Sequence, residues 1–288
     1  TMSKFIYGCG YLGLRVARLW RERGDSVAAL TRSAGRANDL QQHGIVPVVG
    51  DITDSGSLSS LDFEQVDTVL FAVGFDRQSG KSIEEVYVDG LRNVLAVLPD
   101  SISRFVYIST TGVYGQSDGQ VVDEDSPCDP RRPGGKACLA AEQMIQAHGL
   151  AEKSIILRLA GIYGPDRVPR KKDLMSGRLE ASTRGHLNLI HVEDAAEVVL
   201  ADESSTIVPA IYVVSDGNPV PRLEYYQEIC KLLNLHDVEL VDPPVDSPAG
   251  QRALADKRIC SDLMRKQLDV TLRFPSFREG LAAILASE

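Results

Sequence analysis

Short apolar segments alternate with longer amphipathic segments along the first half of the chain. Several of the apolar segments are almost continuously hydrophobic, which is typical of strands covered on both faces. Leu12, Val16, Leu19 and Trp20 recur at helical spacing and predict a first helix that ends at Gly24. The predicted strands of this half are Lys4–Tyr7, Ser26–Leu30, Val46–Val49, Thr68–Val73, Arg104–Ile108 and Ile155–Leu159.

The alternation of strands and helices predicts an α/β fold with a Rossmann-type, doubly wound parallel sheet. The pattern loosens after Gly164-Pro165. We therefore expect a dinucleotide-binding core over residues 1–165 and, over 166–288, mostly a small C-terminal substrate lobe, with 187–215 returning to the core. The other predicted elements are helices at Ser82–Leu98, Lys136–His148, Glu193–Ala201 and Arg222–Leu233, strands at Leu187–Ile190 and Ile211–Val214, and a loop at Asp242–Gly250.

A glycine-rich turn stands between the first predicted strand and the first helix. Its sequence, Gly8-Cys9-Gly10-Tyr11-Leu12-Gly13, fits G-x-G-x-x-G. In this motif the first glycine permits a tight turn, the second lets the backbone approach a pyrophosphate, and the third lets helix and strand pack closely. The free N–H groups of the helix then face the phosphates. Because the motif has its strand–turn–helix context, it predicts a dinucleotide site.

The end of the second predicted strand distinguishes the two nicotinamide dinucleotides. An acidic residue there binds the ribose 2′-hydroxyl of NAD, whereas arginine suits the 2′-phosphate of NADP. Here the strand is followed by Thr31 and Arg32, with Arg36 one helical turn beyond, and no acid is present. Two guanidinium groups can bind a phosphate through charge-assisted hydrogen bonds. NADP is therefore favoured over NAD.

Composition narrows the classes of function. The net charge of -9 argues against a general nucleic-acid surface. The five cysteines are scattered and none are at metal-ligand spacing, so we expect no metal site and a reducing, cytoplasmic environment. No apolar run approaches the roughly 20 residues of a membrane span, so no membrane partner is expected. The chain enters a strand-like segment directly after Thr1–Ser3, and we expect no signal peptide.

Six segments, taken in order, resemble the extended short-chain dehydrogenases/reductases of the NAD(P)-dependent epimerase/dehydratase family. The match runs in order along nearly the whole chain, and the segment Val106–Gly115, at the fifth predicted strand, matches strongly. The matching segments are Gly50–Asp54, Phe71–Gly74, Val88–Leu95, Val106–Gly115, Leu157–Pro165 and Ile190–Ala196.

The resemblance extends the candidate cofactor site beyond the glycine turn. In the family, the acid and apolar residue after the third strand contact the adenine, and the segment after the fourth strand lines ribose and phosphates. The candidate cofactor-binding residues are Gly8, Gly10, Tyr11, Leu12, Gly13, Thr31, Arg32, Arg36, Asp51, Ile52, Phe71, Ala72, Val73 and Leu159.

The family's catalytic centre is only partly matched. Family enzymes combine a Ser or Thr after the fifth strand with a Tyr and a Lys four residues apart on the next helix, where the lysine lowers the tyrosine pKa. The hydroxyl position falls on Thr110, with Thr111 beside it. The tyrosine and lysine positions fall on Gly134 and Cys138, and the nearby Lys136 leaves on the opposite face of the helix. The Tyr–Lys pair is missing.

Three interpretations stay open. The protein is an atypical oxidoreductase or epimerase that uses another acid, for which Tyr114, Tyr163, His191 and Cys138 are candidates, each of which also has a purely structural explanation. Alternatively, Thr110 and water suffice for the proton transfer. As a third alternative, the fold binds NAD(P) without turnover as a sensor or regulatory protein.

The resemblance implies a sugar nucleotide or a small carbonyl or hydroxyl compound as substrate. Tyr163 and His191 are candidate substrate residues, and Arg170 and Lys171 lie in a basic stretch that suits an anionic substrate, although a solvated loop explains the charges equally well. By analogy the family also implies a homodimer formed through the helices at Ser82–Leu98 and Lys136–His148.

Overall fold

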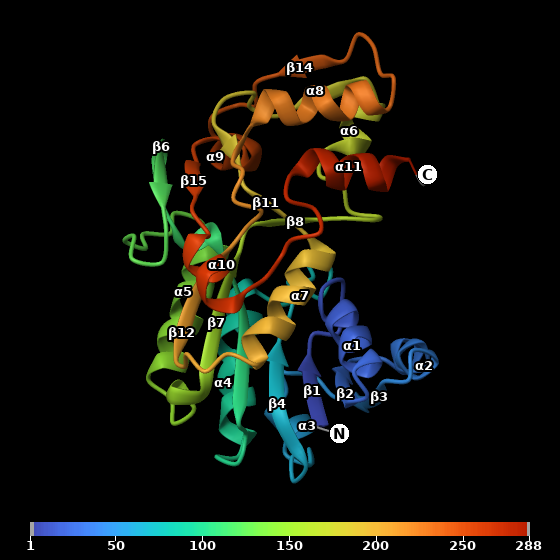
Figure 1. The fold of residues 1–288 in the computed structure, drawn as a ribbon, viewed down its shortest axis with the longest axis vertical. Helices are drawn as coiled ribbons and strands as arrows, with labels where there is room; N and C mark the ends of the chain where they lie inside the picture. The colour runs from blue at the N-terminus through green and yellow to red at the C-terminus, as the bar shows by residue number, and fades with distance from the viewer. Residues whose placement is uncertain (1–2, 287–288) are drawn as a thin grey trace.

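The computed structural model describes residues 3–286. Thr1, Met2, Ser287 and Glu288 lie outside the described residues. The N-terminal segment over which we expect no signal peptide therefore lies partly outside them. A seven-stranded parallel sheet, in the order β12-β7-β5-β4-β1-β2-β3, forms its centre, and this confirms the predicted Rossmann-type fold (Figure 1). The strands are β1 (Ser3–Tyr7), β2 (Ser26–Thr31), β3 (Val46–Val49), β4 (Val66–Phe71), β5 (Arg104–Thr110), β7 (Ser154–Leu159) and β12 (Ala210–Val214).

Alternate residues of the central strands point into two separate cores. On β1, Ile6 belongs to the core of one face, whereas Phe5 and Tyr7 belong to the core of the other. Because successive side chains of a strand point to opposite faces, a sheet covered on both sides needs apolar residues at nearly every position. The first face is covered by α1 (Gly13–Glu22), α7 (Val192–Glu203) and α10 (Asp262–Leu268), and the second by α3 (Ser55–Leu58), α4 (Gly90–Val97) and α5 (Pro133–Gln146).

A smaller lobe stands above one end of the sheet in Figure 1. Its own core contains Tyr163, Tyr225, Phe277 and Leu281, all buried. Its elements are β8 (Gly161–Tyr163), α6 (Lys171–Met175), β9 (Arg178–Glu180), β10 (His186–Leu187), β11 (Leu189–His191), β13 (Val220–Pro221), α8 (Arg222–Leu232), β14 (Glu239–Val241), α9 (Pro248–Ala253), β15 (Asp256–Ile259) and α11 (Phe277–Leu285).

Three element predictions need correction. The helix expected over 82–98 begins with a π-helical segment, η1 (Glu85–Asp89), before α4. The strand expected over 187–190 is two short strands, β10 and β11, which part at Asn188, where the side chain bonds the backbone of Lys257 and Ile259. The expected loop 242–250 ends inside α9, because Ser247 caps that helix by accepting from the Gly250 N–H.

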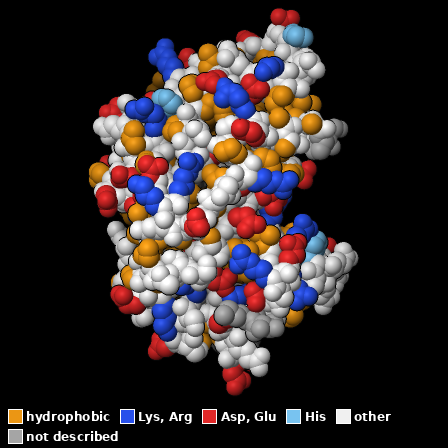
Figure 2. Space-filling model, in the orientation of Figure 1, with side chains coloured by type: hydrophobic (Ala, Val, Ile, Leu, Met, Phe, Trp, Pro, Cys, Tyr) orange, Lys and Arg blue, Asp and Glu red, His pale blue; other side chains and the backbone are white. Residues whose placement is uncertain are grey.

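The remaining elements were not expected from the hydrophobic pattern. They are α2 (Ala34–Gln42), β6 (Ser117–Val122), η2 (Thr111–Val113) and η3 (Ala151–Lys153), of which β6 pairs with β15 of the lobe. No helix in residues 3–286 is both long and apolar enough to cross a membrane. Acidic and basic side chains are intermingled on the face shown in Figure 2.

Candidate functional site

A cavity of about 900 Å³ opens along the carboxyl ends of β1, β2, β4, β5 and β7. In open α/β sheets this edge is where ligands bind. Of the fourteen predicted cofactor-binding residues, twelve line the cavity, and the exceptions are Gly13 and Phe71. Phe71 is buried in the core that α3, α4 and α5 cover, and the residues that follow it, Ala72 and Val73, line the cavity.

The three glycines of the turn have three different surroundings. Gly8 has φ +88° and a Cβ there would lie 2.5 Å from the backbone of Ala72, so only glycine fits. A Cβ on Gly13 would lie 2.4 Å from the Gly8 carbonyl oxygen, which is the close helix–strand packing expected of the third glycine. At Gly10, by contrast, nothing lies within 4 Å of a Cβ. The space beside Gly10 is open toward the cavity, as a bound pyrophosphate requires.

The N-terminus of α1 faces this open space. The helix begins at Gly13 and carries no acidic residue in its first turn. The positive end of the helix dipole is therefore not opposed by an acidic residue of that turn. Together with the open Gly10, this arrangement fits the diphosphate of a dinucleotide.

The adenosine end of the cavity carries the two arginines after β2. Arg36 donates through Nη2 to the Cys9 carbonyl at 2.9 Å. Arg32 forms a half-exposed ion pair with Asp76, with a distance of 3.3 Å between Nη2 and Oδ2. Asp51 also lines this end, and its Oδ1 accepts from both the backbone and the hydroxyl of Thr53. No carboxylate follows β2 directly, in keeping with the sequence.

Thr110 and Thr111 lie at the other end of the cavity, where β5 ends. Thr110 Oγ1 accepts from the Gly112 N–H at 3.0 Å and thereby caps the short helix η2. Its own hydroxyl proton is not used in this bond. Gly134 and Cys138, at the positions where the family has Tyr and Lys, line the same end. The two positions that the sequence comparison aligns with the family's Tyr and Lys thus lie inside the cavity.

The Cys138 thiol lies beside the Tyr107 hydroxyl, and burial raises the Cys138 pKa to about 11. Burial also raises the Tyr107 pKa well above its ordinary value. Both groups line the cavity, and both stay protonated at neutral pH. Neither resembles the activated tyrosine of the family, whose pKa is lowered toward neutrality.

The structure places Tyr114 away from the cavity. Its ring is buried in a small core with Val113 and Ile259, and its hydroxyl accepts from Arg158 at 2.8 Å. Burial raises its pKa above the ordinary value. Arg158 in turn is held by Glu142 in a buried ion pair of 2.6 Å. Tyr114 therefore belongs to a buried polar network with Arg158 and Glu142. It does not line the cavity that Thr110 lines.

The four predicted substrate residues also lie outside the cavity lining. Tyr163 is fully buried in the lobe core, and burial raises its pKa. His191 caps α7 by accepting from the Glu193 N–H, and burial lowers its pKa to about 4. Arg170 pairs with Asp173 at 3.2 Å, and Lys171 begins α6.

Sequence reasoning missed several cavity residues. Hydrophobic patterning marks Tyr87 and Tyr107 as core, although both line the cavity. The positively charged lining residues had no motif around them, and only their tertiary position identifies them. These are Arg77, Lys81 and Arg132, whereas Arg167, which also lines the cavity, belongs to the basic stretch that the sequence marks as suited to an anionic substrate.

Comparisons with known proteins agree with this geometry. Protein YeeZ of Escherichia coli K12 is 27% identical over 90% of this chain and 93% of its own length. A Stigmatella aurantiaca protein, 4-hydroxy-2-methyl-3-oxo-4-farnesyl-3,4-dihydroquinoline-1-oxide ketoreductase, is 30% identical over 76% of this chain and 70% of its own. The solved structure of a functionally unknown conserved protein from Silicibacter pomeroyi has a TM-score of 0.82, with 27% identity over 100% of this chain and 99% of that one.

The model of the NAD dependent epimerase/dehydratase family matches residues 5–214. This range spans all seven strands of the central sheet apart from the first two residues of β1. It also contains the glycine turn, both arginines after β2 and Thr110. The chain therefore belongs to the NAD-dependent epimerase/dehydratase family of the extended short-chain dehydrogenases/reductases.

Proposed function

We propose that this protein is an NADP-dependent reductase of a small carbonyl compound. The observation that carries the proposal is that one cavity contains both groups of residues. Arg32 and Arg36 line the end expected to hold the adenosine, and Thr110 lines the end expected to hold the reacting carbonyl. The ketoreductase relative, which is 30% identical over 76% of this chain, supports reduction as the reaction class. A sugar nucleotide is the alternative substrate class.

The chain's own residues would bind and orient the substrate carbonyl. A bound reduced nicotinamide supplies hydride to the carbonyl carbon. The Thr110 hydroxyl, whose oxygen already accepts from the Gly112 N–H, keeps its proton to donate to the carbonyl oxygen. The Cys138 thiol, with its pKa raised to about 11, stays neutral and adds no charge to the site. The proton that the alkoxide gains comes through Thr110, and water restores it.

NADP is proposed over NAD because the two charged residues that directly follow β2, Arg32 and Arg36, are both positive, although Arg36 also pairs with Asp39 at 3.7 Å. Arg36 is fixed against the glycine turn through the Cys9 carbonyl, and Arg32 is paired only with the half-exposed Asp76. A ribose 2′-phosphate would exchange that weak surface pair for charge-assisted hydrogen bonds.

A non-catalytic NAD(P) sensor is the second candidate. Its supporting observation is that Gly134 and Cys138 face the cavity where the family has its acid–base pair. General acid–base catalysis contributes roughly 10²–10⁴-fold, so its loss leaves a slow enzyme or none. The two candidates differ in turnover and agree in cofactor binding.

One experiment separates them. NADPH and NADH are titrated by the change in their fluorescence, and the saturated protein is then mixed with small aldehydes, ketones and nucleotide sugars while NADPH absorbance is followed. The reductase predicts tight NADPH binding and its consumption with small carbonyl compounds. Tight binding without consumption across the panel would favour the sensor, and consumption only with nucleotide sugars would favour the sugar-nucleotide alternative.

Location and assembly are further proposals. All five cysteines are unpaired, which supports a reducing, cytoplasmic environment. A homodimer through α4 and α5 rests on analogy with the family. Sedimentation of the purified protein tests the dimer, and a monomeric mass at micromolar concentration would contradict it.

A further inference from the structure

Two arginines without carboxylate partners line the cavity, and a third lies on the lobe, close enough for their positive charges to lower its pKa. Arg77 and Arg132 line the cavity, and Arg252 lies on α9 of the lobe. Within residues 3–286, no carboxylate oxygen lies within 4.0 Å of any of their guanidinium nitrogens. We call these three residues the arginine cluster.

The charges of the cluster act on one another. The pKa of Arg252 is lowered by burial and then by the positive charges of Arg170, Arg132 and Arg77. Arg132 also contributes, after burial, to lowering the pKa of Lys257 to about 8. Like charges that repel each other destabilise the fold unless a counter-ion offsets them.

Most other cations around the cavity do have partners, and Arg167, which has no carboxylate partner among residues 3–286, lies over the Tyr11 ring at 5.3 Å. Arg32 pairs with Asp76, and Lys81 pairs with Glu85 at 3.8 Å. Arg36 is bonded to the Cys9 carbonyl. The positive charge of the cofactor end is thus partly compensated, whereas the charge of the arginine cluster is not.

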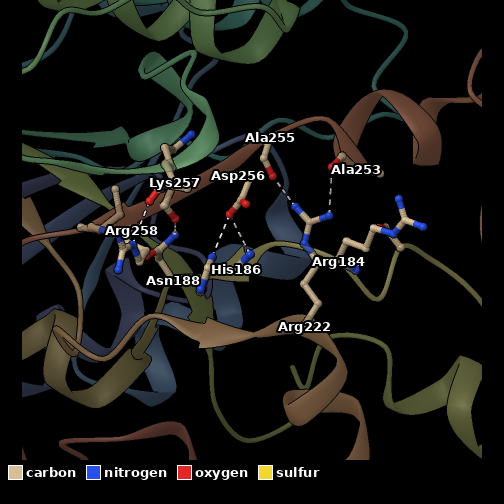
Figure 3. Close-up of polar contacts among 12 residues, drawn as sticks. Arg184, His186, Asn188, Arg222, Ala253, Ala255, Asp256, Lys257 and Arg258 are labelled. Carbon is tan, nitrogen blue, oxygen red and sulfur yellow. Dashed lines mark hydrogen bonds and ion pairs between the residues drawn. The ribbon is translucent and has the colours of Figure 1, made fainter.

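The residues that directly follow Arg252 are held by several hydrogen bonds to the lobe (Figure 3). Arg222 of α8 donates to the carbonyls of Ala253 and Ala255, and the two guanidinium contacts fix the end of α9. Directly after them, Asp256 accepts from the His186 N–H at 3.0 Å and from Nδ1 at 2.9 Å. Binding groups on a segment fixed in this way are pre-organised, which lowers the entropic cost of binding.

The same segment is tied to the turn that follows the catalytic strand. Lys257 Nζ donates to the Tyr114 carbonyl at 2.8 Å, and Asn188 bonds the Lys257 carbonyl at 2.9 Å. Lobe and core are therefore joined next to the end of β5. These bonds fix the backbone directly after α9, which carries Arg252.

Arg132 places the cluster near the catalytic end of the cavity. It immediately precedes α5, whose Gly134 and Cys138 line that end. The start of α5 also packs closely on the turn after Thr110, since a Cβ on Gly135 would lie 2.2 Å from the Gly112 carbonyl oxygen. An anion held by Arg132 is therefore close to a substrate carbonyl held by Thr110.

We propose that the arginine cluster binds an oxyanion carried by the substrate close to its reacting carbonyl, which makes the substrate a keto acid or a phosphorylated carbonyl compound. This inference rests on the proposed reduction. Guanidinium groups suit both anions because their planar donors match carboxylate and phosphate geometry. The two sources of the oxyanion are separated by the test.

The test is an isothermal titration of two probes, malonate and inorganic phosphate, into the NADPH-saturated protein. Arg132→Gln and Arg252→Gln remove one positive charge each, and Arg23→Gln is the matched control, because Arg23 is exposed at the end of α1. We expect at least one probe to bind the unaltered protein and the probe Kd to rise about tenfold or more in each cluster variant. The control should stay within about twofold.

The probe that binds identifies the anion as carboxylate or phosphate. NADPH affinity, measured first, should be equal in all four proteins, so a failure of dinucleotide binding is recognised separately. The titrations are repeated without NADPH. If the probe affinity still depends on Arg132 and Arg252, the anion site is supported independently of dinucleotide binding. Absence of binding by both probes, or equal affinity in the unaltered protein and the cluster variants, would overturn the proposal.

Discussion

The Arg36 guanidinium donates a 2.9 Å hydrogen bond to the backbone carbonyl of Cys9, within the glycine turn itself. A positive charge from the first turn of α2 is thereby fixed beside the glycine turn. The bond joins two features that are 27 residues apart in the sequence. It gives the proposed preference for NADP a structural basis that can be tested.

Arg32→Ala should weaken NADPH binding about tenfold and change NADH binding less than about twofold. The reason is that a charge-assisted hydrogen bond to a phosphate contributes about 1.5–3 kcal/mol, and NADH has no phosphate there. Fluorescence titration of both cofactors measures the two changes, with Arg23→Ala as control. Equal weakening of NADPH and NADH would show that the pair after β2 does not select NADP.

Thr110→Val should lower the rate of carbonyl reduction by roughly 10²-fold, while NADPH affinity stays nearly unchanged. Valine keeps the shape and removes the hydroxyl that lines the cavity. Thr110→Ser should retain most of the activity because it retains the hydroxyl and the bond to Gly112. If the valine variant reduces carbonyls as fast as the unaltered protein, Thr110 has no role in proton transfer.

Tyr114→Phe should instead leave turnover within about twofold and lower stability by about 1–3 kcal/mol. Its hydroxyl accepts from the buried Arg158 at 2.8 Å, and that donor loses a partner in the variant. Turnover and denaturant unfolding are measured on the same preparation. A large loss of turnover with normal stability would instead make Tyr114 a catalytic residue.

Glu142→Gln should destabilise the protein by about 3–5 kcal/mol, because it leaves a buried guanidinium without its counter-charge. Glu142 accepts from Arg158 through both of its carboxylate oxygens and is 1% exposed. The control is Glu239→Gln, which removes an exposed pair with Arg178 and should cost less than about 1 kcal/mol. Urea unfolding measures both, and similar losses would contradict the difference in burial.

His191 should make stability depend on pH between about 6.5 and 4. Burial lowers its folded pKa from 6.5 to about 4, so the unfolded chain binds the proton first as pH falls. Stability is therefore full above pH 6.5 and decreases as pH falls toward 4, by up to roughly 3 kcal/mol. His191→Asn keeps an oxygen to cap α7 and removes the titrating group.

The difference in unfolding free energy between the unaltered protein and His191→Asn isolates this group from the others that titrate in the same range. Asp216 is one of these, since burial raises its pKa to about 7, and its contribution has the opposite sign. We expect the unaltered protein to lose unfolding free energy relative to His191→Asn as pH falls from 7 to 4. A difference that is independent of pH would exclude a buried neutral imidazole at His191.

The parallel sheet was predictable because buried strands and amphipathic helices leave unambiguous patterns. The structure places continuous apolar runs such as Ile155–Leu157 between the two cores. The lobe was harder, because its short strands carry few residues and are held by side-chain bonds such as those of Asn188. Such bonds join positions about seventy residues apart and leave no local signal.

The candidate site divides in the same way. The glycine turn is local in sequence, and its geometry follows from the motif. Tyr163 and His191 lie in segments that resemble family signatures, and the structure packs both against aromatic neighbours in the lobe or at its border. Arg77, Arg132 and Arg252 are far apart in the sequence, and only the tertiary fold brings the charges of Arg77 and Arg132 close enough to Arg252 to lower its pKa.

Gly10→Val tests dinucleotide binding most directly. Because nothing lies within 4 Å of a Cβ on Gly10, the valine should leave the fold intact while its side chain occupies the space that a pyrophosphate needs. NADPH titration of the unaltered protein and the variant, with unfolding temperature as a check on the fold, is the decisive measurement. We predict that NADPH affinity falls by at least about a hundredfold at an unchanged unfolding temperature, and an unchanged NADPH affinity in the folded variant would contradict a dinucleotide site at this turn.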